Sequence, residues 1–215
     1  MSWFIRFIAS SIGKKQVMAV TGFCFLGFLS VHLAGNLTLF GGPEMFKAYA
    51  EGLHSLGPII IAAELGLLAL ALAHVSTGII LFIQNRRARP RGYAVSKSAG
   101  GKTLSSTLMP YTGLYLIGFI TIHLMNFTFA DRTGTDISEL VTAAFHRPLY
   151  IGFYLFSMLV VALHVRHGLW SAFQTVGANH PRYMPAVRGL SVLFALVVGL
   201  GFGALPIWVL SVFEG

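Results

Sequence analysis

The sequence predicts an all-α membrane protein with five transmembrane helices and a short N-terminal helix in the membrane interface. Of the 215 residues, 55% are hydrophobic and only 10% are charged, whereas a soluble domain carries about 25% charged residues. Five apolar windows reach the length of roughly 20 residues that a membrane helix needs. Windows this long and this uniformly apolar cross a bilayer as helices, because no water is present to satisfy an open backbone.

The elements follow in chain order. Residues 1–13 combine Trp3, Phe4 and Phe7 with Arg6, which predicts a short helix lying in the membrane interface. The first apolar window is longer than the core of a signal peptide and more windows follow it, so we expect it to remain as a span. We expect one domain, residues 1–215, without an internal repeat. The predicted spans are residues 16–39, 58–83, 108–129, 148–173 and 189–213.

The positive charges lie mostly in the N-terminal tail and in the second and fourth loops. The eleven residues there are Arg6, Lys14, Lys15, Arg86, Arg87, Arg89, Arg91, Lys97, Lys102, Arg182 and Arg188. The first and third loops hold only Lys47, Arg132 and Arg147. Basic loops mark the cytoplasmic side, so we expect a cytoplasmic N-terminus and an external C-terminus. This distribution accounts for the net charge of +8 without nucleic acid as a partner.

Two further features limit the possible functions. The basic segment 86–102 has two interpretations: a topology signal that contacts lipid headgroups, or a docking surface for a partner. Cys24 is the single cysteine and no C-x-x-C-H motif is present. An internal disulfide, an iron–sulfur cluster and covalently attached haem are therefore excluded, and any cofactor must be held by other ligands.

Histidines inside the spans are the main candidate site residues. His32, His74 and His123 each lie within a different span, and a fourth span carries the pair His164 and His167. The remaining three, in loops or at helix ends, are His54, His146 and His180. An intramembrane histidine marks a functional site or makes a hydrogen bond between helices. Its recurrence on four helices favours the first interpretation.

The depths of these histidines group them into two pairs. At 1.5 Å per residue, His32 and His123 lie about 10 Å below the outer edge, and His74 and His164 lie about 14 Å above the inner edge. Two imidazoles at one level suit the axial positions of one b-type haem, so four suit two stacked haems in a haem-binding four-helix core. Zinc fits less well, because its structural sites bring four ligands together.

Small residues next to the histidines support a flat cofactor. Gly78 and Gly168 each follow a histidine by four residues, which places them on the same helix face. Gly35 follows His32 by three. These glycines leave room for a porphyrin, or they permit close helix packing. Thr77, three residues after His74, is expected to hydrogen-bond that histidine.

Three other polar residues in the spans have alternative interpretations. His167 competes with His164 as ligand, or it binds a haem propionate or a backbone carbonyl. Arg166 pairs with a propionate, or it extends to the cytoplasmic interface as long basic side chains do. Glu64 lies at the depth of His32 and His123. It passes protons to or from a quinone, or it is a protonated residue bonded to a neighbouring helix.

Several segments together resemble a known family. They are "TGFCFLGFLSVHLAGNLTLFGG" with "FKAYAEGL", then "AHVSTG", "TIHLMNF" and "ALHVRHGLWSAFQTVG". They are similar to the cytochrome b membrane-anchor subunit of succinate:quinone oxidoreductases, the group of succinate dehydrogenases and fumarate reductases. The resemblance is to the type with one anchor polypeptide, five helices and two haems b, and it covers essentially the whole chain.

The resemblance implies axial ligands at His32, His74, His123 and His164, with His32 opposite His123 and His74 opposite His164. It implies a multi-pass protein of a bacterial or archaeal-type inner membrane, able to join a higher oligomer. It also implies a flavoprotein and an iron–sulfur subunit on the cytoplasmic side, with menaquinone or ubiquinone as the membrane electron carrier. Dicarboxylate chemistry is expected on those partners, because this chain has no flavin fingerprint and no cluster cysteines.

Two alternatives stay open at this point. The chain is also consistent with a b-type cytochrome subunit of another quinone-linked enzyme, such as a formate dehydrogenase or a hydrogenase. A haem-free transporter or proton channel that uses the histidines as a relay belongs to a different class. Haem content separates this last alternative from the other two.

Overall fold

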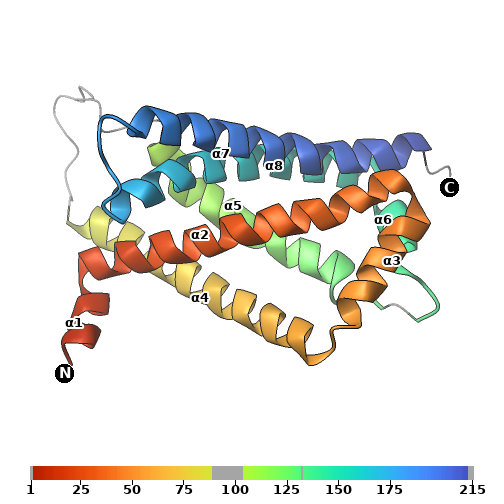
Figure 1. Ribbon diagram of the computed structural model, residues 1–215, viewed down its shortest axis with the longest axis horizontal. Coiled ribbons are helices and arrows are strands. Elements are labelled where there is room, and N and C mark those ends of the chain that lie inside the picture. The colour runs from red at the N-terminus through yellow and green to blue at the C-terminus, as the bar shows by residue number, and fades with distance from the viewer. Residues whose placement is uncertain (1, 89–103, 132, 213–215) are drawn as a thin grey trace.

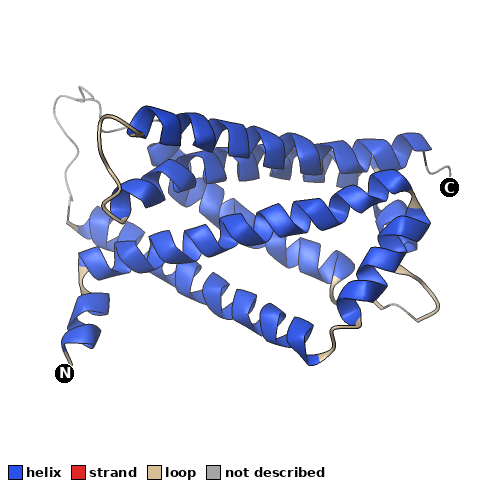
Figure 2. Ribbon diagram, viewed as in Figure 1, coloured by secondary structure: helices blue, strands red, loops and turns tan. Residues whose placement is uncertain are grey.

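The computed structural model describes residues 2–88, 104–131 and 133–212, and this part of the chain is built from helices and their connections (Figures 1 and 2). The elements in order are α1 (Trp3–Ala9), α2 (Ser11–Asn36), a short 3-10 helix η1 (Leu37–Gly41), α3 (Pro43–His54), α4 (Pro58–Arg87), α5 (Leu104–Phe127), α6 (Ile137–Phe145), α7 (Pro148–Thr175) and α8 (Met184–Val212).

The five expected membrane helices are confirmed. In the described part of the chain, α2 with η1, α4, α5, α7 and α8 are long and apolar enough to cross a membrane. Most extend beyond the apolar windows; α2, for example, begins at Ser11 and α4 ends at Arg87. A helix continues past the hydrocarbon region because its backbone hydrogen bonds remain favourable at the interface. Most of the basic segment 86–102 lies outside the described residues.

The short N-terminal helix is also confirmed. It ends where Ser10 adopts an extended conformation, and the Ser10 hydroxyl oxygen accepts a hydrogen bond of 3.0 Å from the Gly13 amide at the start of α2. Gly13 fits closely against the backbone of Phe7 and Ile8, so a side chain there would collide with α1. The bend turns α1 away from the axis of α2 and leaves Trp3 73% exposed (Figure 1). An exposed apolar helix with this geometry suits the membrane interface.

Two short helices, α3 and α6, were not predicted. They lie together at the end of the bundle opposite the N-terminus (Figure 1). Lys47 of α3 forms a salt bridge of 3.5 Å with Asp136, the residue that caps α6. The hydrogen bond to Asp136 raises the pKa of Lys47, and the Ser138 hydroxyl lowers the pKa of Asp136. Both helices are too short to register as apolar windows.

Four long helices surround a common interior. α2 packs against α4 and α7, while α5 packs against α7 and more lightly against α4. α2 and α5 are therefore diagonal partners, and so are α4 and α7. α8 lies outside this ring, along α7 and against α2 (Figure 1). A transmembrane four-helix arrangement of this kind offers its interior as a cofactor site.

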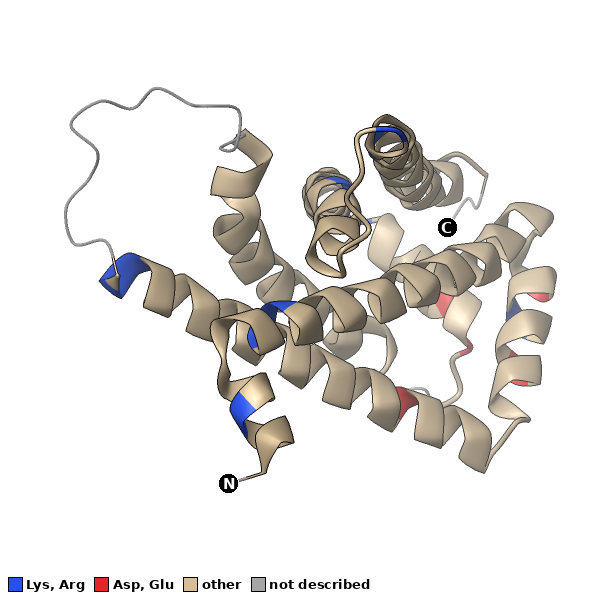
Figure 3. Cartoon of the chain, turned by 60° about the vertical axis from the view of Figure 1, so that its left-hand side comes forward, with Lys and Arg blue, Asp and Glu red and all other residues tan. Residues whose placement is uncertain are grey.

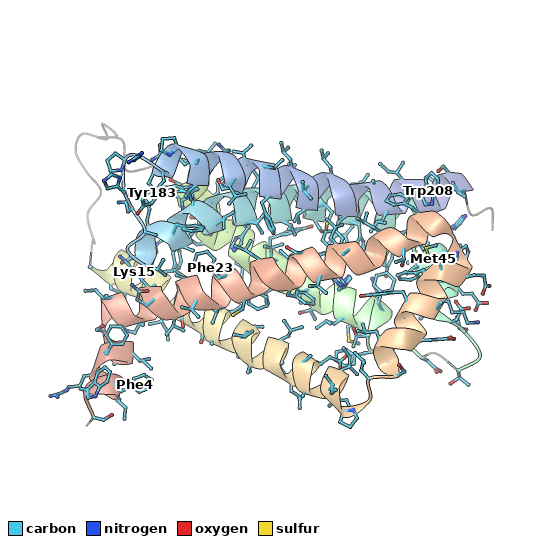
Figure 4. All side chains as sticks on the ribbon, viewed as in Figure 1. Phe4, Lys15, Phe23, Met45, Tyr183 and Trp208 are labelled. Carbon is cyan, nitrogen blue, oxygen red and sulfur yellow. The ribbon has the colours of Figure 1, made fainter. Side chains whose placement is uncertain are left out.

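The two ends of the bundle differ in chemistry. Figure 4 shows Phe4, Lys15 and Tyr183 at one end and Met45 and Trp208 at the other. Basic residues gather mainly at the end that holds α1 and the start of α2, whereas the acidic residues of the described part of the chain lie on α3, α4 and α6 and in the connection before α6 (Figure 3). The tightest packing of the core joins α7 and α8, where Ser157, Val198 and Val209 are almost fully buried. α4 is held less tightly: its buried residues are Thr77 and Leu81.

The cap of α6 generates a prediction about stability. Asp136 accepts hydrogen bonds from the amides of Ser138 and Glu139 at 2.9 and 3.1 Å, and loss of such a cap costs about 1 kcal/mol. Asp136→Ala should therefore lower the thermal unfolding midpoint of the detergent-solubilised protein, while Asp136→Asn should retain most of the cap.

The pH dependence has a definite sign. Because the pKa of Asp136 is lowered in the folded protein, its charged form stabilises the fold above the ordinary carboxyl pKa, and this contribution is lost as pH falls through the lowered value. The difference between the wild-type protein and Asp136→Ala should shrink in acid. Equal midpoints at neutral pH would contradict the assignment.

Candidate haem site

The structure brings His32 and His123 together across the bundle and places His74 and His164 on the other two diagonal helices, α4 and α7. His32 of α2 and His123 of α5 have ring centres 5.9 Å apart, with ring planes at 89°. A metal–imidazole nitrogen bond is about 2.0 Å long and a ring centre lies about 1 Å further, so two rings on opposite sides of one metal have centres about 6 Å apart. The spacing of this outer pair fits one iron held axially by two imidazoles.

The inner pair is held by two threonines. The Thr21 hydroxyl oxygen on α2 lies 2.9 Å from Nδ1 of His74 on α4. Thr112 on α5 lies 3.1 Å from Nδ1 of His164 on α7. The prediction that Thr77 hydrogen-bonds His74 is wrong, because the Thr77 hydroxyl donates to the Ala73 carbonyl at 2.5 Å.

The threonines fix which ring nitrogen carries the proton. A threonine hydroxyl has one proton and two lone pairs. Thr21 donates its proton to the Val17 carbonyl at 2.8 Å, and Thr112 donates to that of Met109 at 3.0 Å. With its proton bonded in this way, each hydroxyl oxygen is available to accept from Nδ1–H of the histidine. The lone pair of the neutral imidazole is left on Nε2, which is the form that binds a metal.

The outer pair has longer polar contacts. Nδ1 of His32 lies 3.4 Å from the Asn36 side-chain nitrogen, and Nδ1 of His123 lies 3.4 Å from the Tyr154 hydroxyl. In all four rings Nδ1 thus faces a protein polar group. The polar side-chain contacts of these four rings thus all involve Nδ1, and His74 has a further hydrogen bond to the backbone of Met18. The two sites share a ligand type but differ in how firmly the rings are held.

The three glycines that follow histidines do not share one role: two fit space for a porphyrin, and one fits close helix packing. A Cβ added at Gly168 would meet nothing within 4 Å, and one at Gly78 would approach only the Met18 sulfur at 3.9 Å. Open space on the ligand face at these two positions fits a flat porphyrin. Gly35 differs, because a Cβ there would collide with the ring of Tyr49 on α3. Close packing between α2 and α3 explains that glycine.

The other polar candidates lie at separate places. His167 is buried beside Trp170, with ring centres 5.1 Å apart, and its Nδ1 has no hydrogen-bond partner among the described residues. Arg166 is exposed and lines a small cavity of about 180 Å³ together with Thr112 and Ser105. Glu64 is exposed on α4, and the described part of the chain offers it no hydrogen-bond partner.

Thr21 and Thr112 are the site residues that sequence reasoning missed, although a signal was present. Segments 21–32 (TGFCFLGFLSVH) and 112–123 (TGLYLIGFITIH) share Thr-Gly, then Gly-Phe, then the outer histidine. His74 and His164 both begin an H-V-x-x-G pattern. Corresponding residues are 91 apart in the first pattern and 90 in the second. The expectation that the chain has no internal repeat is therefore wrong.

The fold carries the same repeat. α2, α3 and α4 follow one another as long, short and long helices, and so do α5, α6 and α7. Pro58 and Pro148 each begin the second long helix. The diagonal pairs therefore join equivalent helices, α2 with α5 and α4 with α7. In such a repeat, each half contributes one histidine to each of the two predicted pairs.

Comparisons with known proteins agree with the resemblance. The chain is similar to the succinate dehydrogenase cytochrome b558 subunit of Bacillus subtilis (strain 168), with 27% identity over 174 residues that cover 80% of this chain and 81% of the relative. No family model matches the chain, and no solved structure matches it. The matched length includes most of the helices that carry the histidine pairs, so the resemblance read from the motifs is confirmed.

Proposed function

We propose that this chain is the membrane anchor and di-haem cytochrome b subunit of a succinate:quinone oxidoreductase. In this role it relays electrons between a cytoplasmic iron–sulfur subunit and quinone in the membrane. The observation that carries the proposal is the pairing of four half-buried imidazoles on diagonal helices, each with Nδ1 facing a protein group. The name of the Bacillus subtilis relative supports the same role.

Haem b supplies a one-electron carrier at each pair when it is bound. His32 and His123 hold the outer haem, and His74 and His164 hold the inner one. The chain orients these rings through their Nδ1 partners, and its apolar helices keep water from the ligand face. Gly78 and Gly168 leave the space that a porphyrin occupies.

His167 and Arg166 are proposed to bind haem propionates at the inner level. The buried Nδ1 of His167 lacks a protein partner, and an orphaned polar atom inside a membrane protein costs free energy unless a ligand satisfies it. Arg166 lines a cavity beside Thr112, which contacts the inner ligand His164. A propionate is an anion that both side chains can pair with.

Glu64 is proposed to exchange protons with menaquinone or ubiquinone near the outer haem. It is a carboxylate in an otherwise apolar stretch of α4, exposed and without a protein partner in the described residues. Reduction of a quinone to a quinol takes up two electrons and two protons. A carboxylate that faces the lipid side of the bundle can deliver those protons where the quinone resides.

The partners are proposed to dock at the basic end of the bundle, which is then the cytoplasmic side. The basic residues concentrate there (Figure 3). They include Arg6 of α1, Lys14 near the start of α2, Arg86 near the end of α4 and Arg188 near the start of α8. A flavoprotein and an iron–sulfur subunit there perform the dicarboxylate chemistry, and the assembly is able to form a higher oligomer. The five helices act as one domain. The relative's name favours this role over a formate dehydrogenase or hydrogenase subunit.

Single histidine substitutions should separate the two haems. His32→Leu and His123→Leu should each leave the inner haem in place, and His74→Leu and His164→Leu should each leave the outer one, because each haem needs both of its axial ligands. Haem per chain and the reduced α-band spectrum of the purified complex measure this. His54→Leu, at the exposed end of α3, should keep both haems. A colourless wild-type protein prepared with ample haem supply would instead support the haem-free relay.

The porphyrin space at Gly168 gives a steric prediction. Gly168→Val should abolish binding of the inner haem, because the side chain fills the ligand face of α7. Gly152→Val is the matched control: this glycine lies in the same helix, is exposed and also has no neighbour within 4 Å. Haem stoichiometry and spectra should change for Gly168→Val alone. Equal haem content in both variants would place the porphyrin elsewhere.

Glu64→Gln should slow quinone turnover by roughly 10²-fold, the contribution of one acid–base group. Haem content should stay intact. Succinate oxidation with an artificial electron acceptor serves as the internal reference, since it does not need the quinone site. Glu51→Gln on α3, also exposed, is the control variant. Unchanged quinone turnover in Glu64→Gln would exclude the proton role.

A further inference from the structure

We infer that Thr21 with Gly22, and Thr112 with Gly113, are positioning residues that orient the inner ligands His74 and His164 toward the iron. This inference deepens the proposed function and rests on it, because it assumes that the inner pair binds haem. Neither threonine is a ligand. Each acts through the imidazole of the neighbouring helix.

The threonine supplies the directional contact. Its hydroxyl proton is bonded to its own helix backbone, at Val17 for Thr21 and at Met109 for Thr112, as is common for threonine inside membrane helices. Its oxygen is thereby available as an acceptor, at 2.9 Å from Nδ1 of His74 and 3.1 Å from Nδ1 of His164. The Nδ1–H bond sets the rotation of each ring and leaves the Nε2 lone pair on the opposite side.

The following glycine supplies the steric contact. A Cβ built at Gly22 would lie 3.7 Å from Cε1 of His74, and one built at Gly113 would lie 3.6 Å from Cε1 of His164. A methyl group at either position would make an ordinary van der Waals contact with the ring, whereas a longer side chain would reach into the space that the ring occupies. The threonine therefore directs the ring, and the glycine keeps the space for it.

The outer pair offers an internal comparison. Its Nδ1 contacts are longer, at 3.4 Å, and come from Asn36 and Tyr154. Changes at the two threonines should therefore affect the inner haem selectively. The repeat supports the assignment independently. A threonine of α2 contacts the histidine of α4, and the equivalent threonine of α5 contacts the histidine of α7.

A hydrogen bond from Nδ1–H makes an imidazole a stronger electron donor to its metal. The donating ligand stabilises oxidised iron. Loss of the acceptor should therefore raise the midpoint potential of the inner haem and weaken haem binding, and partners of this kind change metal affinity by about 10- to 100-fold.

The test uses Thr21→Val and Thr112→Val in the intact complex. Valine keeps the shape of threonine but removes the acceptor. Each variant should show a raised inner-haem potential in a spectroscopic redox titration and a haem affinity lower by about 10- to 100-fold, with the outer haem unchanged. Thr21→Ser and Thr112→Ser should restore both values. Thr121→Val is the matched control, because Thr121 makes the same backbone bond in α5, to Ile117 at 2.8 Å, and contacts no histidine.

Side chains of increasing size at Gly113 test the role of the glycine. Gly113→Ala should leave the inner haem intact, whereas Gly113→Leu should displace His164 and abolish binding of the inner haem. Gly118→Leu in the same helix, where a Cβ meets nothing within 4 Å, is the control and should keep the inner haem.

Wild-type potentials in both valine variants, a shift that serine does not reverse, or a change confined to the outer haem would each overturn the inference. Absence of haem from the wild-type complex would instead overturn the proposed function itself.

Discussion

The structure depends on how the polar atoms of four imidazoles are satisfied among apolar helices. A neutral histidine has one donor and one acceptor, and an unmet polar atom in a bilayer costs several kcal/mol by the usual order of magnitude. The hydroxyl oxygens of Thr21 and Thr112 are available to take up the donor of the inner rings, because their own protons are bonded to the backbone. The acceptor that would then remain, Nε2, is the atom that the proposed function assigns to haem iron.

The repeat explains why this solution occurs at two ring pairs. In each half, one helix carries the Thr-Gly dipeptide near one end and the outer histidine eleven residues later. The next helix carries the inner histidine. When two such halves pack with equivalent helices on the diagonal, His32 and His123 meet, and His74 and His164 lie on the other diagonal. The two proposed haem levels would therefore follow from one helical spacing used twice, and α8 covers only one side of the four helices.

Much of the fold and part of the site could be predicted from the sequence. The long apolar helices were predictable because length and hydrophobicity are local properties, and the proximity of His32 and His123 was predictable because helices of known rise convert position into depth. α3 and α6 were missed because short amphipathic helices resemble ordinary loops. Thr21 was missed because a partner for His74 was sought on its own helix, at Thr77, whereas the contact to His74 crosses between helices.

The two levels are not equivalent, although the helices that form them are. The inner rings are held by hydroxyl acceptors at about 3 Å, within the normal hydrogen-bond range, whereas the outer rings face an amide and a phenol at 3.4 Å. α4 is also loosely packed, so one side of the bundle near Glu64 is open to lipid. Equal ligands in unequal surroundings give different potentials. In the proposed function, the two haems would therefore have different potentials although their ligands are the same.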